Sequence, residues 1–283
     1  MIAFLCLLSL AIGLYLYKTV AGFGGGFSGG LAEPEGEKRA FVTSPWAVPA
    51  ALAAGWVFKG LWREALGFPF DVMCHELGHS LTAWLGGRWS IPVIAGIAMT
   101  DSAPSLFLSI LVAGAIAWLS WKAVKARSPL ALFCCALLIT GFVHLQFIVP
   151  GKQFEEYLLL GGHAGEFVFP ALLIAAFYHR GPAGLRWDWL RYPVMVASAF
   201  SLVGAWQFWA KAVADPVTGI YGVSVAARSV AGSDVARLIG GYAWTAQLAV
   251  DRALLLGRAA WLFVALVYLR FALDRKPGAG AAS

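Results

Sequence analysis

Residues 157–178 read YLLLGGHAGEFVFPALLIAAFY, a run of 22 residues in which Glu166 is the only charged side chain. A helix needs about 20 mostly apolar residues to cross the hydrocarbon core of a bilayer. The stretch therefore predicts a transmembrane helix. An ionisable residue inside such a helix is costly, so Glu166 is a functional candidate from the outset.

Apolar runs of similar character recur along the chain. They lie at 2–17, 45–58, 104–121, 130–149, 193–210, 235–250 and 255–272. We expect residues 2–17 to be a retained span, because no basic segment precedes them as it would in a signal peptide. With the shorter runs counted cautiously, the sequence predicts an all-α, polytopic helical membrane protein with about six to eight transmembrane segments.

The composition supports lipid as the solvent of this chain. Of its 283 residues, 60% are hydrophobic and 13% are charged, and the mean hydropathy is +0.74. Soluble domains carry about 25% charged residues. We therefore expect residues 1–283 to form a single membrane-embedded domain, with a glycine-rich and charged loop at 21–44. We expect an integral, multi-pass protein of the cell inner membrane.

The basic residues follow the same pattern. The net charge is +6, and the tightest basic clusters lie at 122–127, 180–191 and 270–276, at the ends of apolar runs. Such placement is typical of residues that flank transmembrane helices. A nucleic-acid footprint would instead be a clustered stripe. The pattern indicates membrane lipid as a partner and no nucleic acid.

A second helix carries a chemical motif. Residues 75–79 read HELGH, within a helix that we predict over 69–86. Pro69 suits the first turn of this helix, and the glycine pair that begins at Gly86 suits its end. The β-branched segment 88–96 that follows is broken by a proline and is expected to be extended.

The motif residues have the types and the spacing of a zinc site. His75 and His79 are four residues apart and project from one helix face, so both imidazoles can bind one metal ion. Glu76 lies beside them and can accept a proton from metal-bound water. We predict a Zn²⁺ site with His75 and His79 as ligands and Glu76 as the catalytic base.

Residues 74–89, CHELGHSLTAWLGGRW, resemble the site-2 protease class of membrane zinc metallopeptidases. The resemblance covers about residues 70–100. It implies a peptidase that hydrolyses peptide bonds of membrane-associated proteins, with a membrane protein or peptide as substrate. The late Asn-Pro-x-Asp-Gly or Leu-Asp-Gly motif that supplies the third zinc ligand in that class is absent from this chain.

Two segments are candidates for the third ligand. Glu166 and His163 are three residues apart and share a helix face, and we expect the neighbouring glycines and Pro170 to interrupt that helix. The alternative is Asp234, in a Ser-Asp pair similar to an element of some site-2 protease-like sequences. Asp234 is also a plausible helix cap and has Arg237 nearby as a pairing partner. We favour Glu166, with His163 either beside it or in its place.

Two other functions share these residues. A membrane zinc hydrolase could act on a substrate other than protein, such as a lipid. A non-catalytic membrane protein could bind the same metal. All three functions are compatible with zinc, so only turnover that depends on Glu76 separates the enzymes from the scaffold.

Overall fold

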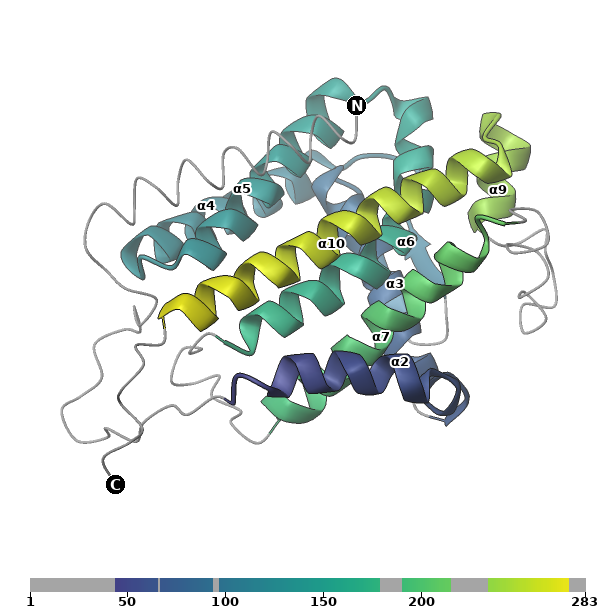
Figure 1. Ribbon diagram of the computed structural model, residues 1–283. Helices are drawn as coiled ribbons and strands as arrows, with labels where there is room; N and C mark the ends of the chain where they lie inside the picture. Colours follow the sequence, from purple (N-terminus) through teal and green to yellow (C-terminus); the bar gives the residue numbers. More distant parts are fainter. Residues whose placement is uncertain (1–43, 66, 94–96, 179–189, 215–233, 275–283) are drawn as a thin grey trace.

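The computed structural model describes residues 44–65, 67–93, 97–178, 190–214 and 234–274. Within these ranges nearly all the secondary structure is helical (Figure 1). In chain order the elements are α2 (Ala47–Ala65), α3 (Gly67–Leu85), β1 (Ser90–Val93), β2 (Ile97–Thr100), α4 (Leu106–Lys125), α5 (Pro129–Val143), the π-helical turn η1 (His144–Ile148), α6 (Gly151–Ala176), α7 (Arg191–Lys211), α9 (Asp234–Tyr242) and α10 (Ala246–Asp274).

The predicted all-α membrane fold is confirmed. Five helical segments of the described residues are long and apolar enough to cross a bilayer, and they are Leu106–Lys125, Ala131–Ile148, Gln153–Ala176, Arg191–Lys211 and Ala246–Leu273. They account for five of the six to eight expected spans. The run 2–17 and the loop 21–44 lie outside the described residues.

The last two apolar runs, 235–250 and 255–272, contribute one spanning helix. The run 235–250 divides into the short helix α9 and the first turn of the 29-residue helix α10. The break occurs because Ala243 adopts φ +57°, and the Trp244 N–H then bonds the Leu238 carbonyl at 3.3 Å. The backbone N–H of Leu248 bonds Thr245 Oγ1 at 3.0 Å, which caps α10.

The expected interruption of α6 is absent. The helix runs without a break from Gly151 to Ala176, with Pro170 inside it. Pro170 removes one backbone hydrogen bond, but it is almost fully buried among neighbouring helices. Membrane helices tolerate proline where surrounding protein compensates for the lost bond.

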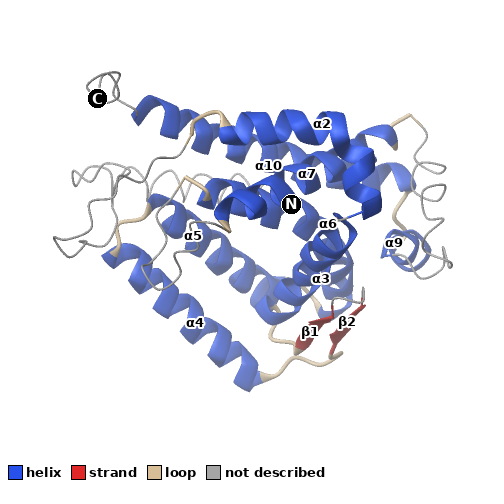
Figure 2. Cartoon of the chain, turned by 90° about the horizontal axis from the view of Figure 1, so that it is seen from below, coloured by secondary structure: helices blue, strands red, loops and turns tan. Residues whose placement is uncertain are grey.

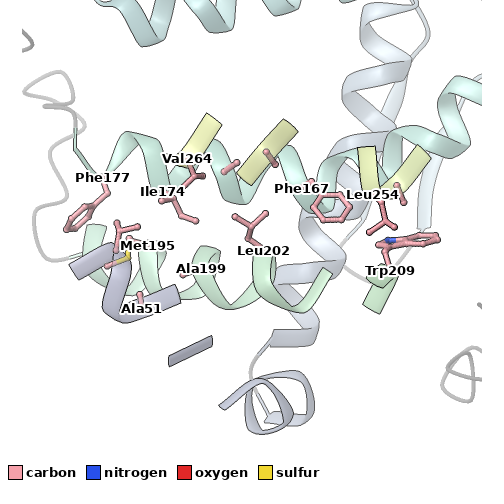
Figure 3. Close-up of a cluster of buried hydrophobic side chains, with 14 of the residues drawn as sticks. Ala51, Phe167, Ile174, Phe177, Met195, Ala199, Leu202, Trp209, Leu254 and Val264 are labelled. Carbon is pink, nitrogen blue, oxygen red and sulfur yellow. The ribbon is translucent and has the colours of Figure 1, made fainter. Parts of the chain in front are cut away.

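The main apolar core lies between α6, α7, α10 and α2. Figure 3 shows its side chains, with Phe167 and Ile174 from α6 facing Leu202 of α7 and Val264 of α10. Each of these four side chains is at most 4% exposed. Figure 2 shows α4 on the side of the molecule opposite α2, away from this core.

The segment after α3 is extended, as the sequence predicted. Strands β1 and β2 pair antiparallel, with Ser90 opposite Thr100. Hydroxyl contacts of 3.0 Å join Ser80 of α3 to Ser90, and Ser90 to Thr100. The indole N–H of Trp84 donates to the Ser90 carbonyl at 2.9 Å. These bonds attach the hairpin to the C-terminal half of the motif helix.

Helices α3 and α6 cross with their backbones almost touching. A Cβ atom on Gly78 of α3 would lie 2.9 Å from the Gly165 Cα of α6, and it would overlap the Gly161 carbonyl. Glycines four residues apart are a frequent contact surface between membrane helices, because they let two backbones approach closely. This crossing brings the motif histidines onto α6.

Candidate metal centre

The two motif histidines point at each other. His75 and His79 lie on successive turns of α3, and their Nε2 atoms are 3.0 Å apart. The two rings meet edge to face, with centroids 4.7 Å apart. The i, i+4 spacing therefore does what the sequence predicted, which is to present two imidazole nitrogens to one point.

A carboxylate from a distant part of the chain reaches the same point. Asp234, the first residue of α9, places Oδ2 2.9 Å from His75 Nε2 and 2.8 Å from His79 Nε2. Three donor atoms from two helices thus lie within 3.0 Å of one another. Ligand atoms of one tetrahedral zinc ion are about 3.3 Å apart, given bonds of about 2.0 Å.

The Nδ1 atoms of both histidines, which face away from this point, also have hydrogen-bond partners. His75 Nδ1 lies 2.6 Å from Glu166 Oε1, and His79 Nδ1 lies 2.7 Å from the carbonyl oxygen of Leu158. Both partners are acceptors on α6, so each histidine donates its Nδ1–H and leaves Nε2 with a free lone pair. Metal-binding histidines generally carry such an outer partner, which sets the tautomer and orients the ring.

His163 belongs to a second group that shares His75. Its Nδ1 lies 3.3 Å from Glu166 Oε1, and its ring packs against His75 with centroids 5.0 Å apart. His75, His163 and Glu166 are thus also close enough to hold an ion. This second group uses the Nδ1 side of His75, whereas the group with His79 and Asp234 uses the Nε2 side.

Glu76 is buried beside the convergence point. Its side chain is 5% exposed, and Oε2 has no hydrogen-bond partner among the described residues. Its carboxylate interacts electrostatically with the two motif histidines and with Asp234. A buried carboxylate oxygen without a partner is costly in a structural role, and it has the free acceptor capacity that a base requires.

Gly162 of α6 forms the floor of the centre. A Cβ atom on this residue would lie 2.6 Å from His75 Nε2 and closer still to His79 Nε2. Any larger side chain would therefore fill the space that the two nitrogens face. From the sequence, Gly162 was expected only to interrupt the helix, although the spacing of Gly161 and Gly165 is a signal for close helix packing.

Asp234 is held in the ionised form that a metal requires. Burial raises the pKa of its carboxyl, but the close contacts with the His75 and His79 imidazoles outweigh that effect and bring the pKa below its ordinary value. Arg237, the sequence-based candidate for its pairing partner, is exposed. The ion pairs of Asp234 within the described chain are with the two histidines.

The structure therefore gathers every site residue that the sequence singled out. His75, Glu76 and His79 come from α3, while His163 and Glu166 come from α6. Asp234, which the sequence ranked second as third ligand, contacts both motif histidines. Comparison with known proteins gives no independent identification, since no protein-family model, curated protein or solved structure matches the chain.

Proposed function

We propose that the chain is a membrane-embedded zinc peptidase in which His75, His79 and Asp234 are the protein ligands. The observation that carries this proposal is the convergence of two imidazole Nε2 atoms and one carboxylate oxygen within 3.0 Å. Three protein ligands and one open position are the usual donor set of a catalytic zinc ion.

The proposal revises the sequence-based choice of the third ligand. Because a neutral imidazole has a free lone pair on one of its two nitrogens, His75 serves either the group with Asp234 or the group with Glu166. Only the group with Asp234 uses both motif histidines. Glu166 and His163 then act as outer partners, with Glu166 accepting the Nδ1–H of His75 at 2.6 Å.

The space in the centre also suits a metal ion. Gly162 leaves room where a side chain would collide with both Nε2 atoms, and the buried Glu76 carboxylate, which interacts electrostatically with the same three side chains, has an oxygen without a hydrogen-bond partner in the described chain. Zinc, when bound, would supply a Lewis acid that lowers the pKa of its water toward about 7. Glu76 would act as the base in this chemistry, by taking up a proton at a carboxylate oxygen and returning it to the leaving amine nitrogen.

The substrate class rests on the resemblance of residues 74–89 to site-2 proteases and on the surroundings of the centre. The ligands come from α3 and α9, and both of these helices pack against α6, which is long and apolar enough to cross a bilayer. A peptide bond in a substrate helix is internally hydrogen-bonded, so it has to unwind locally before hydrolysis. We propose peptide bonds of membrane proteins as the substrate and the cell inner membrane as the location.

Zinc stoichiometry and turnover in detergent test the proposal. Purified protein is expected to hold about one zinc ion per chain, and His75→Ala, His79→Ala or Asp234→Ala to lose most of it. Glu166→Ala and His163→Ala are expected to weaken zinc by the roughly 10–100-fold typical of outer partners. Glu76→Gln is expected to keep zinc and lose about 10²–10⁴-fold in cleavage of a membrane-protein panel.

The alternatives predict other outcomes of the same experiment. Full zinc affinity in Asp234→Ala together with its loss in Glu166→Ala would restore the sequence-based ligand set. Turnover that depends on Glu76 with lipids but not with proteins would indicate a non-protein substrate. Zinc binding without turnover of either class would indicate a metal-binding scaffold.

A further inference from the structure

Asp234 lies on a short helix that is not stable without tertiary contacts. Helix α9 has nine residues, and isolated helices of this length are unstable in water because nucleation is unfavourable. Its buried side chains are Val235 and Leu238. The position of the Asp234 carboxylate must therefore depend on contacts that α9 makes elsewhere.

The C-terminal end of α9 is followed by a tight turn that contains an unfavourable backbone conformation. Ala243 has φ +57°, and the Trp244 N–H bonds the Leu238 carbonyl six residues back. A residue in the left-handed conformation directly after a helix is usually glycine. An alanine in that conformation costs about 1–2 kcal/mol, so neighbouring contacts have to stabilise the closure.

Two consecutive carboxylates of α6 supply such contacts. The Tyr242 hydroxyl donates to Glu155 Oε2, and the Trp244 indole N–H donates to Glu156 Oε2 at 3.1 Å. The hydrogen bond to Glu155 raises the pKa of Tyr242 to about 12, so the phenol remains a donor at neutral pH. We call these four residues the clasp.

The clasp and the centre lie two helical turns apart on the same helix. Seven residues separate Glu155 from Gly162, or roughly 10 Å at 1.5 Å per residue. Eight residues separate Tyr242 from Asp234, or roughly 12 Å. Helices α9 and α6 are in contact, and the near match of the two lengths indicates that α9 runs antiparallel to the N-terminal half of α6, with one end at the clasp and the other at the floor of the centre.

We propose that Glu155 and Glu156 are positioning residues, which fix Asp234 against the two motif histidines by binding Tyr242 and Trp244. The inference rests on the proposed zinc centre. It makes α6 the common support of all three ligands, because the same helix also binds His79 through the Leu158 carbonyl and His75 through Glu166.

Zinc affinity of the full-length protein in detergent tests the clasp. The double substitution Tyr242→Phe/Trp244→Phe removes both donors and keeps both aromatic rings. We expect it to weaken zinc about 10–100-fold, as loss of outer support does. The matched control is Tyr192→Phe/Trp46→Phe, which changes exposed rings outside the centre and is expected to leave zinc affinity unchanged.

A double-mutant cycle separates positioning from general destabilisation. If the clasp acts through Asp234, removing the clasp lowers zinc affinity little further in a protein that already lacks the Asp234 carboxylate, because the effects of coupled residues are not additive. In the Asp234→Ala background we therefore expect less than about a twofold further loss. Glu155→Gln/Glu156→Gln keeps an acceptor oxygen at both positions and is expected to retain wild-type affinity within about threefold.

Each result has one interpretation. Equal loss in both backgrounds, or no loss with Tyr242→Phe/Trp244→Phe, overturns the clasp and leaves the proposed ligands intact. Loss with Tyr192→Phe/Trp46→Phe of the same size also overturns it. Wild-type protein that binds no zinc overturns the proposed function, and the clasp with it.

Discussion

Helices α4 and α6 are almost equally apolar and yet have opposite surroundings. Their spanning segments have mean hydropathies of 1.7 and 1.6, respectively. In α6, 56% of the spanning residues are buried within the protein, against 17% in α4. Hydropathy thus identifies both helices as spans and does not tell which one builds the interior of the bundle.

The difference lies in small and polar residues rather than in apolar ones. On α6, Gly161 and Gly165 contact the backbone of α3, and Gly162 faces the motif histidines. On α4, a Cβ atom on Gly114 would meet nothing within 4 Å. Apolar side chains gain little by leaving lipid for protein, so membrane helices associate through close packing and hydrogen bonds.

The sharpest test of this comparison exchanges one glycine on each helix for alanine. Gly162→Ala places a methyl group against both His75 Nε2 and His79 Nε2, so we expect zinc binding and turnover to be lost. Gly114→Ala on α4 should be neutral or stabilising by up to about 1 kcal/mol, because alanine is the better helix former. Elemental analysis and thermal unfolding in detergent measure the two effects.

The control for Gly162→Ala is a measurement that the variant keeps the wild-type fold. Far-ultraviolet circular dichroism should stay at the wild-type level, because the added methyl group meets side chains rather than the α3 backbone. A Gly162→Ala protein with full zinc content would show that the ion does not lie between the two Nε2 atoms.

A second test compares two isoleucines of equal size. Ile174 of α6 is 0% exposed in the core, and Ile110 of α4 is 64% exposed. Ile174→Ala should lower the free energy of unfolding by about 2–5 kcal/mol, because a cavity forms in a packed interior. Ile110→Ala should change it by less than about 0.5 kcal/mol, as a surface substitution does. Unfolding by SDS in mixed micelles measures both, and similar losses would mean that α4 is covered by protein.

A third test concerns a polar contact of α4, where we expect a loss well below that of Ile174→Ala. Gln146 of η1 donates to Ser109 Oγ at 2.9 Å. Hydrogen bonds between membrane helices contribute about 0.6 kcal/mol on average, so Ser109→Ala should cost that amount in the same assay. A loss above about 2 kcal/mol would show that the α4 side is as specifically packed as the α6 side.

Much of the site was predictable because its chemistry is local. His75, Glu76 and His79 lie within five residues of one helix, and helical periodicity alone puts the two imidazoles on one face. Glu166 and His163 were found for a similar reason, since ionisable residues are conspicuous in an apolar run. What local reasoning did not provide was the choice among carboxylates for the third position.

Hydropathy and short-range periodicity were enough to predict the membrane-spanning helical class, the motif helix and the extended segment after it. The contacts of Glu166 with the Nδ1 side of His75, and of Asp234 with the Nε2 side, required the three-dimensional structure. Those contacts join residues 91 and 159 positions apart. They depend on how closely α6 approaches α3 and on where α9 lies along α6, and neither distance is encoded in the pattern of any single helix.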